Sequence, residues 1–480
     1  MSGAPTADTV DDDAAGRLGL RLPDAAAAQS AARTANHRLR DATLRLKALL
    51  DKPLASYYLI LGCTLLLLSV GLMMVLSAGT AYDLDNGLPA YSMFEKQLAG
   101  ALVGLVLMWL AGRSSPRLFR ACAYPLLLAA LLGVALVLLF GVEVDGAKRW
   151  LIVAGTQVQP SELAKLALVV WGADLLARKE RLGQLTDARH LLIPLLPGAA
   201  LLSLLVVLGK DLGTTFLLLV IFLTLLWIIG TPGKLLAGMA GLMAFVMLIV
   251  VVVHPYELAR ITSFFSAHSP SCQTLSCYQL IQGKDALGSG GLFGVGSGAS
   301  RAKWGWVPNS PTDFIFAILG EELGLVGTVC VVALYGGIAF AGLRIARRAP
   351  DTFSRLAAGA ITVWLVVQAM VNMGAVLGLL PISGVPLPLI SAGVSSLLAS
   401  LVALGMLMAF ARAEPGAAQA LAAAGPPAPV RLLRRLGLGR GAGATPARLV
   451  AVPRAGSVAA AWPARAADRR ARGRGVPPPQ

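Results

Sequence analysis

Long apolar segments recur from about residue 56 to residue 411, and they constrain this chain more than any other feature. A helix of roughly 20 residues crosses the ~30 Å hydrocarbon core of a bilayer. The sequence is 56% hydrophobic and only 14% charged, whereas a soluble domain is about 25% charged because water must wet its surface. We therefore predict an all-α polytopic membrane protein, a bundle of about ten transmembrane helices. The expected helices cover about residues 56–79, 96–112, 118–140, 160–177, 189–209, 211–230, 234–254, 313–342, 354–380 and 386–411.

Basic residues indicate which connections face the cytoplasm, because cytoplasmic connections of membrane proteins are rich in Lys and Arg. They gather in the N-terminal tail and in the second, fourth and eighth connections, whereas the first holds Asp83, Asp85 and Glu95 and the ninth has no charge. This pattern predicts a multi-pass protein with both termini in the cytoplasm. The longest connection, residues 255–312, is then a large extracytoplasmic loop between helices 7 and 8, and connections of this length without regular structure are usually functional.

The two tails lie outside the transmembrane domain, which we expect to span residues 56–411. Residues 1–55 are expected to form a mostly disordered cytoplasmic tail, and residues 412–480 a disordered, basic cytoplasmic tail. The net charge of +16 arises from the tails and the cytoplasmic connections and not from a basic, aromatic surface, which argues against nucleic-acid binding. The C-terminal tail either binds acidic lipid headgroups or an acidic partner, or only keeps the chain soluble.

The five cysteines do not have the spacing of a metal site. Cys63, Cys122 and Cys330 lie inside apolar segments, where a cysteine packs as a small hydrophobic residue. Cys272 and Cys277 lie in the long polar connection, where an extracytoplasmic location would permit a disulfide. Both the bonded and the free state remain open.

Polar motifs concentrate at the outer ends of the predicted helices. Ionisable residues inside a membrane cost about 2.5–3.5 kcal/mol each to insert, so those that remain are usually functional. The motifs are Gly146-Ala147-Lys148-Arg149-Trp150, Gln159-Pro160-Ser161-Glu162-Leu163-Ala164-Lys165, Lys210-Asp211-Leu212-Gly213-Thr214, the glycine-rich segment 288–298, Thr312-Asp313-Phe314-Ile315-Phe316-Ala317 and Gly320-Glu321-Glu322-Leu323-Gly324.

These motifs resemble those of the SEDS (shape, elongation, division and sporulation) family, and they are most similar to those of its division members. The resemblance covers about residues 56–411. Its most specific parts are residues 312–324 and the late motifs Asn372-Met373-Gly374, Gly378-Leu379-Leu380-Pro381, Pro386-Leu387-Pro388 and Ser391. Three motifs depart from the family pattern. Pro308-Asn309-Ser310-Pro311 stands where the family has Pro-Glu-Ala-His, Lys210-Asp211 where it has Pro-Asp, and Gly393-Val394 where it has Gly-Gly. The first departure removes a carboxylate and an imidazole.

The resemblance implies a peptidoglycan glycosyltransferase that polymerises lipid II at the outer face of the bacterial cytoplasmic membrane during cell division. In the implied reaction, a sugar 4-hydroxyl attacks the anomeric carbon of the growing chain and the lipid pyrophosphate leaves with inversion. The resemblance also implies a class B penicillin-binding protein as the partner transpeptidase, a location at the division septum, and contacts of the cytoplasmic tails with other division proteins. A lipid II flippase and the elongation polymerase of the family are the alternatives. A scaffold that recruits division proteins is a third role, compatible with the polymerase.

Asp313 is the predicted catalytic residue, because the attacking hydroxyl needs one carboxylate nearby to take its proton. Asp313 and Thr312 would alternatively cap the following helix, and Glu162 and Lys165 would alternatively form only a local ion pair. Glu321 and Glu322 are expected too deep for the headgroup, about 12 Å along the helix at 1.5 Å per residue. The glycine-rich segment is expected to let the backbone approach the headgroup. A divalent cation, Mg²⁺ or Mn²⁺, would assist at an unknown site. The predicted substrate-binding residues are Lys148, Arg149, Trp150, Gln159, Glu162, Lys165, Asp211, Arg260, Ser300, Lys303 and Asn372.

Overall fold

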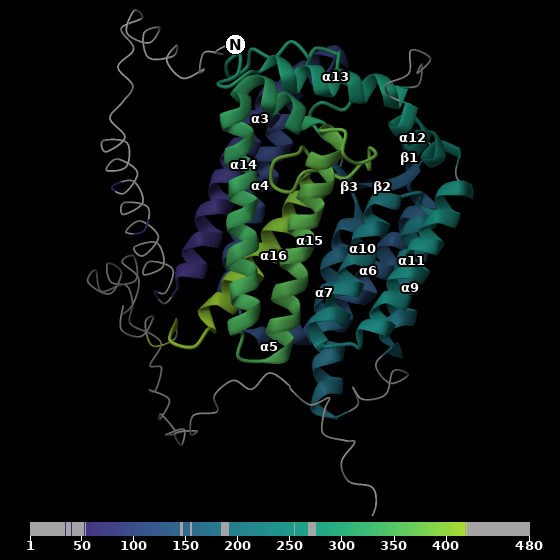
Figure 1. The fold of residues 1–480 in the computed structure, drawn as a ribbon, viewed down its shortest axis with the longest axis vertical. Coiled ribbons are helices and arrows are strands. Elements are labelled where there is room, and N and C mark those ends of the chain that lie inside the picture. The colour runs from purple at the N-terminus through teal and green to yellow at the C-terminus, as the bar shows by residue number, and fades with distance from the viewer. Residues whose placement is uncertain are drawn as a thin grey trace, which may run out of the picture. The chain divides into compact units, whose positions relative to one another are not determined.

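The computed structural model describes residues 52, 54–144, 147–153, 156–183, 192–253, 255–266 and 275–417, together with positions 34, 40 and 419 (Figure 1). Both predicted tails lie almost entirely outside these residues, so their disorder stays a prediction. Within the described part of the chain, eight helices are long and apolar enough to cross a membrane. They are α3 (Ala55–Asp85), α4 (Ser92–Arg113), α6 (Ala123–Phe140), α10 (Leu212–Ile229), α11 (Gly233–Val253), α14 (Ile315–Arg348), α15 (Thr352–Val376) and α16 (Val394–Arg412).

Two further helices, α7 and α9, stand where the sequence predicts the fourth and fifth spans. The first of them, α7 (Pro160–Arg181), has 22 residues and carries the buried charged side chains of Glu162, Lys165 and Asp174. The other, α9 (Leu195–Leu208), has only 14 residues. The predicted helical membrane fold is confirmed, whereas the count of ten spans stays a prediction.

The connections divide between two ends of the bundle, as a chain of antiparallel helices requires. Figure 1 shows α12 (Pro255–Ser266), α13 (Leu275–Ser289) and three strands at one end, and the short helix α5 (Pro116–Ala121) at the other. At the α5 end, hydrogen bonds from arginines join neighbouring elements. Arg120 donates to Asp174 at 2.9 Å, Arg355 donates to Glu180 at 3.2 Å, and Arg412 donates to the carbonyl of Gly112 at 2.9 Å. The basic connections therefore share one end, as the predicted cytoplasmic side requires.

The third connection forms a small antiparallel sheet that the sequence analysis does not predict. Its strands are β1 (Val142–Val144), β2 (Ala147–Val153) and β3 (Thr156–Val158), in the order β1-β2-β3. Glu143 lies opposite Lys148 across the first pair, and Leu151 lies opposite Val158 across the second. Opposite charges at directly facing positions stabilise such a pair by about 0.2–1 kcal/mol.

The structure corrects two sequence expectations about regular structure. The 255–312 connection was expected to lack it, but it contains α12 and α13. Cys277, in α13, is disulfide-bonded, while Cys272 lies outside the described residues. The last span was expected from residue 386, but α16 begins at Val394. Residues 386–393 are not helical because Pro386 and Pro388 lack the N–H that a helix interior needs.

Small residues let the helices approach closely, which is how membrane helices pack where lipid removes most of the hydrophobic driving force. In α16, a Cβ on Gly405 would lie 2.5 Å from the carbonyl oxygen of Met108 in α4. In α3, a Cβ on Gly71 would lie 2.3 Å from the carbonyl oxygen of Leu389. This second approach places α3 directly against the connection between α15 and α16.

Candidate active site

Residues 377–393, between α15 and α16, form a non-helical segment that we call the late connection. Non-helical backbone at membrane depth requires partners for its polar groups from the protein itself. Side chains supply them: Gln368 donates to the carbonyl of Pro386 at 2.9 Å, Asn372 donates to that of Val385 at 2.8 Å, and Tyr335 donates to that of Pro388. Buried side chains of α14 and α15 thus fix this segment.

Asp313 lies two residues before α14 and is held against the late connection through backbone groups. Asn372, which also binds Val385, donates to the carbonyl of Asp313 at 2.9 Å. Ser391 donates to the carbonyl of Thr312 at 2.7 Å, and the amide of Ala392 donates to that of Pro311 at 2.9 Å. Asp313 itself is half-buried. Its position is therefore set by residues that lie about 60 to 80 positions later in the chain.

The alternative that Asp313 and Thr312 cap the following helix stays a prediction. The N-cap residue of α14 is Phe314, whose side chain forms no cap hydrogen bond. The hydroxyl of Thr312 donates instead to the carbonyl of Asn309 at 3.2 Å. In contrast, Asp211 is a true N-cap, because its carboxylate accepts from the amide of Thr214 at 3.1 Å and it begins α10.

Two guanidinium groups converge on the late connection at Gly384. A Cβ there would lie 3.5 Å from Arg260 of α12 and 3.6 Å from Arg149 of β2. Arg149 also donates to the carbonyl of Lys210, just ahead of α10. Gly384 has φ +66°, a conformation that glycine adopts without strain. Two cations therefore lie beside the segment that holds Asp313, an arrangement suited to a phosphate-bearing ligand.

Gln159 and Asp211 form a hydrogen bond with each other near Arg149. Gln159 donates to Asp211 at 3.0 Å, Ser161 donates to the same carboxylate at 3.1 Å, and the backbone of Gln159 binds Ser395 of α16 at 3.0 Å. A cavity of about 20 Å³ adjoins them, lined in part by Lys148 and Arg149, and a space of that size holds one water molecule. On β2, Lys148 is exposed and Trp150 is half-buried.

Glu162 and Lys165 form a fully buried network and not an isolated pair. The ammonium of Lys165 donates to Glu162 at 2.8 Å and to Gln368 at 2.9 Å, and it lies 5.2 Å from the ring centroid of Trp364. Gln368 also accepts from the indole of Trp364 at 2.8 Å and donates to Pro386. The pair is thereby connected to the late connection.

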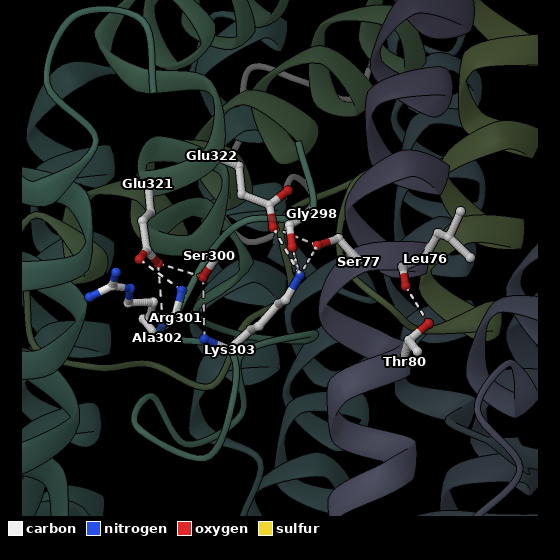
Figure 2. Close-up of polar contacts among 10 residues, drawn as sticks. All are labelled: Leu76, Ser77, Thr80, Gly298, Ser300, Arg301, Ala302, Lys303, Glu321 and Glu322. Atoms are coloured by element: carbon white, nitrogen blue, oxygen red, sulfur yellow. Dashed lines mark hydrogen bonds and ion pairs between the residues drawn. The ribbon is translucent and has the colours of Figure 1, made fainter. Parts of the chain in front are cut away.

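Ser300 and Lys303 belong to a second cluster, which Figure 2 shows between the large loop and α3. Ser300 donates to Glu321 at 2.5 Å, and the backbone amide of Arg301 donates to the same carboxylate at 3.0 Å. Lys303 lies 3.4 Å from Glu322. The two glutamates thus organise this loop, which adds a role to the one expected for them inside the bundle.

The helix α14 is interrupted at Gly324, and the glycine-rich segment packs tightly against this break and forms hydrogen bonds with it. Gly324 departs from helical geometry, with φ 66° and ψ −164°. The amides of Val295 and Gly296 donate to the carbonyls of Glu321 and Glu322, while the amides of Leu325 and Val326 donate to residues 291 and 292. A Cβ on Gly294 would lie 2.1 Å from the carbonyl oxygen of Glu322. The backbone here approaches α14, whereas the sequence analysis expected it to approach a headgroup.

Most of the predicted site residues therefore lie around the late connection, whereas Ser300 and Lys303 lie in the second cluster. Among the described residues, three or more His, Cys, Asp or Glu side chains nowhere gather in a way that could hold a metal ion, so the divalent cation stays a prediction. Sequence reasoning did not select four polar side chains that fix these clusters, because they read as single polar residues in or near apolar segments. They are Ser77, Gln97, Gln368 and Tyr335.

A bundle of long apolar helices that bury polar networks between them is the architecture of a polytopic membrane protein. Residues 57–415 match the family described as cell cycle protein, which unites FtsW, RodA and SpoVE. The chain belongs to this family, and the predicted SEDS membership is confirmed.

Relatives and solved structures agree with this membership. The chain is 40% identical over 394 residues to the probable peptidoglycan glycosyltransferase FtsW of Mycobacterium tuberculosis, covering 81% of this chain and 74% of that protein. It is 34% identical to the stage V sporulation protein E of Bacillus subtilis, covering 73% and 95%. RodA of Thermus thermophilus superposes with a TM-score of 0.54 at 27% identity, covering 74% and 96%. A chain described under "Structural coordination of polymerization and crosslinking by a peptidoglycan synthase complex" superposes with a TM-score of 0.58 at 27% identity, covering 74% and 98%.

Proposed function

We propose that this chain is a peptidoglycan glycosyltransferase that polymerises lipid II into glycan strands at the outer face of the cytoplasmic membrane. Family membership and the relatives named as probable peptidoglycan glycosyltransferases support this proposal. The observation that carries it is the placement of Asp313. Asn372 and the late connection hold this carboxylate-bearing residue at the start of α14, at the bundle end opposite the basic connections.

Asp313 acts as the general base in the proposed reaction. Its carboxylate accepts the proton of a sugar 4-hydroxyl as that oxygen attacks the anomeric carbon of the other glycan, and the bond from that carbon to the pyrophosphate breaks with inversion. Arg149 and Arg260, which converge at Gly384, stabilise the negative charge that develops on the leaving pyrophosphate. The divalent cation that the sequence analysis predicts would assist this step, held by Asp313 or a second acidic side chain.

The other predicted ligands have different roles in this scheme. Asn372 positions Asp313, and Gln159 and Asp211 hold each other beside Arg149. Lys148 and Trp150 on β2 lie at the edge of the site, where they would contact the headgroup. Glu162 and Lys165 act through Gln368 on the late connection and do not contact substrate.

We further propose that the polymerase acts in cell division, with a class B penicillin-binding protein as its transpeptidase partner. The support is the similarity to FtsW proteins and to a chain of a peptidoglycan synthase complex. A location at the septum, cytoplasmic termini and recruitment of other division proteins by the tails are parts of the same proposal. The elongation role of a RodA-type polymerase remains the alternative, because RodA shares the fold.

The decisive experiment measures polymerisation of fluorescent lipid II by the full-length protein with its partner transpeptidase. We expect Asp313→Asn to abolish polymer, while Asp285→Asn retains it, because Asp285 is an exposed carboxylate on neighbouring α13. A lipid-scrambling assay on the same samples tests the flippase alternative. Scrambling without polymer, equal in wild type and Asp313→Asn, would refute the polymerase proposal.

A further inference from the structure

A second cavity opens at the same end of the bundle, between α3 and the large loop. Its volume is about 270 Å³. Thr80 and Ser77 of α3 line one side, and Lys303 and Trp304 of the loop line the other, with Tyr91 ahead of α4 at the rim. Tyr91 and Trp304 are 57% and 53% exposed. The proposed reaction at Asp313 uses none of these side chains, although the sequence analysis predicted Lys303 to bind substrate.

The loop wall of this cavity is rigidly held. Glu321 accepts hydrogen bonds from Ser300 and from the backbone amides of Arg301 and Ala302, at 2.5, 3.0 and 3.4 Å (Figure 2). Glu322 binds Ser77 at 2.5 Å, which ties the loop cluster to α3. A wall fixed in this way is already formed before a ligand enters, so little ordering entropy opposes binding.

The charge of Lys303 is already satisfied within the wall. Its ammonium has three hydrogens to donate, and three acceptors surround it: Ser77 at 2.8 Å, the carbonyl of Gly298 at 2.6 Å and Glu322 at 3.4 Å. Glu322 balances its positive charge, and no hydrogen is left for an incoming phosphate. The cavity is therefore a poor site for a pyrophosphate group.

The remaining chemistry of the cavity suits an uncharged, polyhydroxylated ligand. The hydroxyl of Thr80 donates to the carbonyl of Leu76 at 2.6 Å, which leaves its two lone pairs to accept from a ligand hydroxyl. Ser77 gives its proton to Glu322 and accepts from Lys303, which leaves it one lone pair. Tyr91 and Trp304 offer broad apolar faces, and the C–H face of a sugar ring packs on such surfaces. Aromatic walls with a few fixed polar atoms are the usual composition of a ligand site.

We propose that this cavity is a saccharide subsite that binds a sugar unit of the β-1,4-linked N-acetylhexosamine chain, away from the reacting bond. This inference rests on the proposed function for the identity of its ligand. Trp304 stacks on the sugar, and the hydroxyls of Thr80 and Ser77 accept its hydrogen bonds. Holding a remote unit of the chain keeps a growing strand bound between additions, so the subsite determines strand length.

The test measures binding of the tetramer of β-1,4-linked N-acetylglucosamine to the full-length protein by calorimetry. The protein is placed in lipid nanodiscs, because maltoside detergents carry sugar headgroups of their own. Trp304→Ala should weaken tetramer binding by on the order of tenfold, the cost of truncating a tryptophan anchor. Trp306→Ala is the matched control: Trp306 lies two positions away and is 59% exposed, but it does not line the cavity.

Further variants separate a folding defect and a failure of the proposed function from a failure of this inference. Trp304→Phe keeps an aromatic face and should retain most of the binding, and Asp313→Asn should bind the tetramer like wild type. With lipid II as substrate, Trp304→Ala should yield shorter strands than Trp306→Ala. A wild type that polymerises lipid II but does not bind the tetramer, or equal binding by the two alanine variants, overturns the subsite and leaves the proposed polymerase intact. Tetramer binding in a protein that makes no polymer would instead overturn only the polymerase.

Discussion

Replacing Lys165 by methionine tests whether the buried network of α7 maintains the fold or contacts substrate. Lys165 is 0% exposed and Glu162 is 2% exposed. Methionine keeps most of the apolar stem but removes the ammonium, and the second carboxylate oxygen of Glu162 already has no hydrogen-bond partner. Lys165→Met therefore leaves a buried carboxylate without its cation, whereas Gln368 keeps its bonds to Trp364 and Pro386.

The expected cost follows from that orphaned charge. Removing one partner of a buried ion pair typically destabilises a protein by about 3–5 kcal/mol. Glu162→Gln in the same chain removes the charge, and a buried amide with incomplete hydrogen bonding costs about 1–3 kcal/mol. The double variant should therefore be about 2 kcal/mol more stable than Lys165→Met alone. Non-additivity of this size is expected for residues in direct contact.

Equilibrium unfolding in mixed micelles, followed by tryptophan fluorescence, measures these free energies for the wild type, both single variants and the double variant. Lipid II polymerisation is measured on the same samples under conditions where each remains folded. The reasoning is refuted if Lys165→Met has the unfolding free energy of the wild type yet makes no polymer. Such a result would assign the ammonium to the substrate.

Two more substitutions test the glycine-rich segment and the anchor of Asp313. Gly294→Ala should destabilise the chain by about 2 kcal/mol or more, because the new Cβ would meet the carbonyl of Glu322 at 2.1 Å and the residue has φ +80°. Gly288→Ala is the control, because nothing lies within 4 Å of the new Cβ, and it should not destabilise the chain. Thermal melting compares the two glycine variants, and equal melting temperatures would contradict the tight packing at Gly294. Asn372→Leu should lower the free energy of unfolding by about 2–4 kcal/mol, because the carbonyls of Asp313 and Val385 both lose a hydrogen-bond donor. The folded variant should also polymerise lipid II more slowly than wild type. An unchanged rate would mean that Asn372 does not position Asp313.

The sequence predicted the elements that depend on local composition. Apolar length alone located α10 and α11 to within two residues at each end, and the change from polar loop to apolar segment placed Asp313 just before α14. The start of α16 was missed because residues 386–393 are as apolar as a helix. Their non-helical conformation depends on Gln368, Asn372 and Tyr335, which are distant in sequence.

The partners of the charged residues were less accessible to sequence reasoning. Lys303 and Glu322 are 19 positions apart. The break at Gly324 and the glycine segment packed against it help to bring the loop back onto α14. No periodicity marks that break, which follows Glu321 and Glu322 within three residues. The strands β1 and β3 have three residues each, too few for an alternating pattern to be recognised.

The late connection explains why so many buried polar residues serve one site. Its prolines remove amides, and its remaining carbonyls must find donors inside the protein because lipid offers none. Gln368, Asn372 and Tyr335 supply those donors. The same donors fix the segment against which Asp313, Arg149 and Arg260 lie. The hydrogen bonds that make non-helical backbone tolerable in the bundle therefore also set the geometry of the proposed reaction. Stability and activity should therefore change together at the donor positions, whereas they should separate at the two arginines, whose guanidinium groups lie beside Gly384.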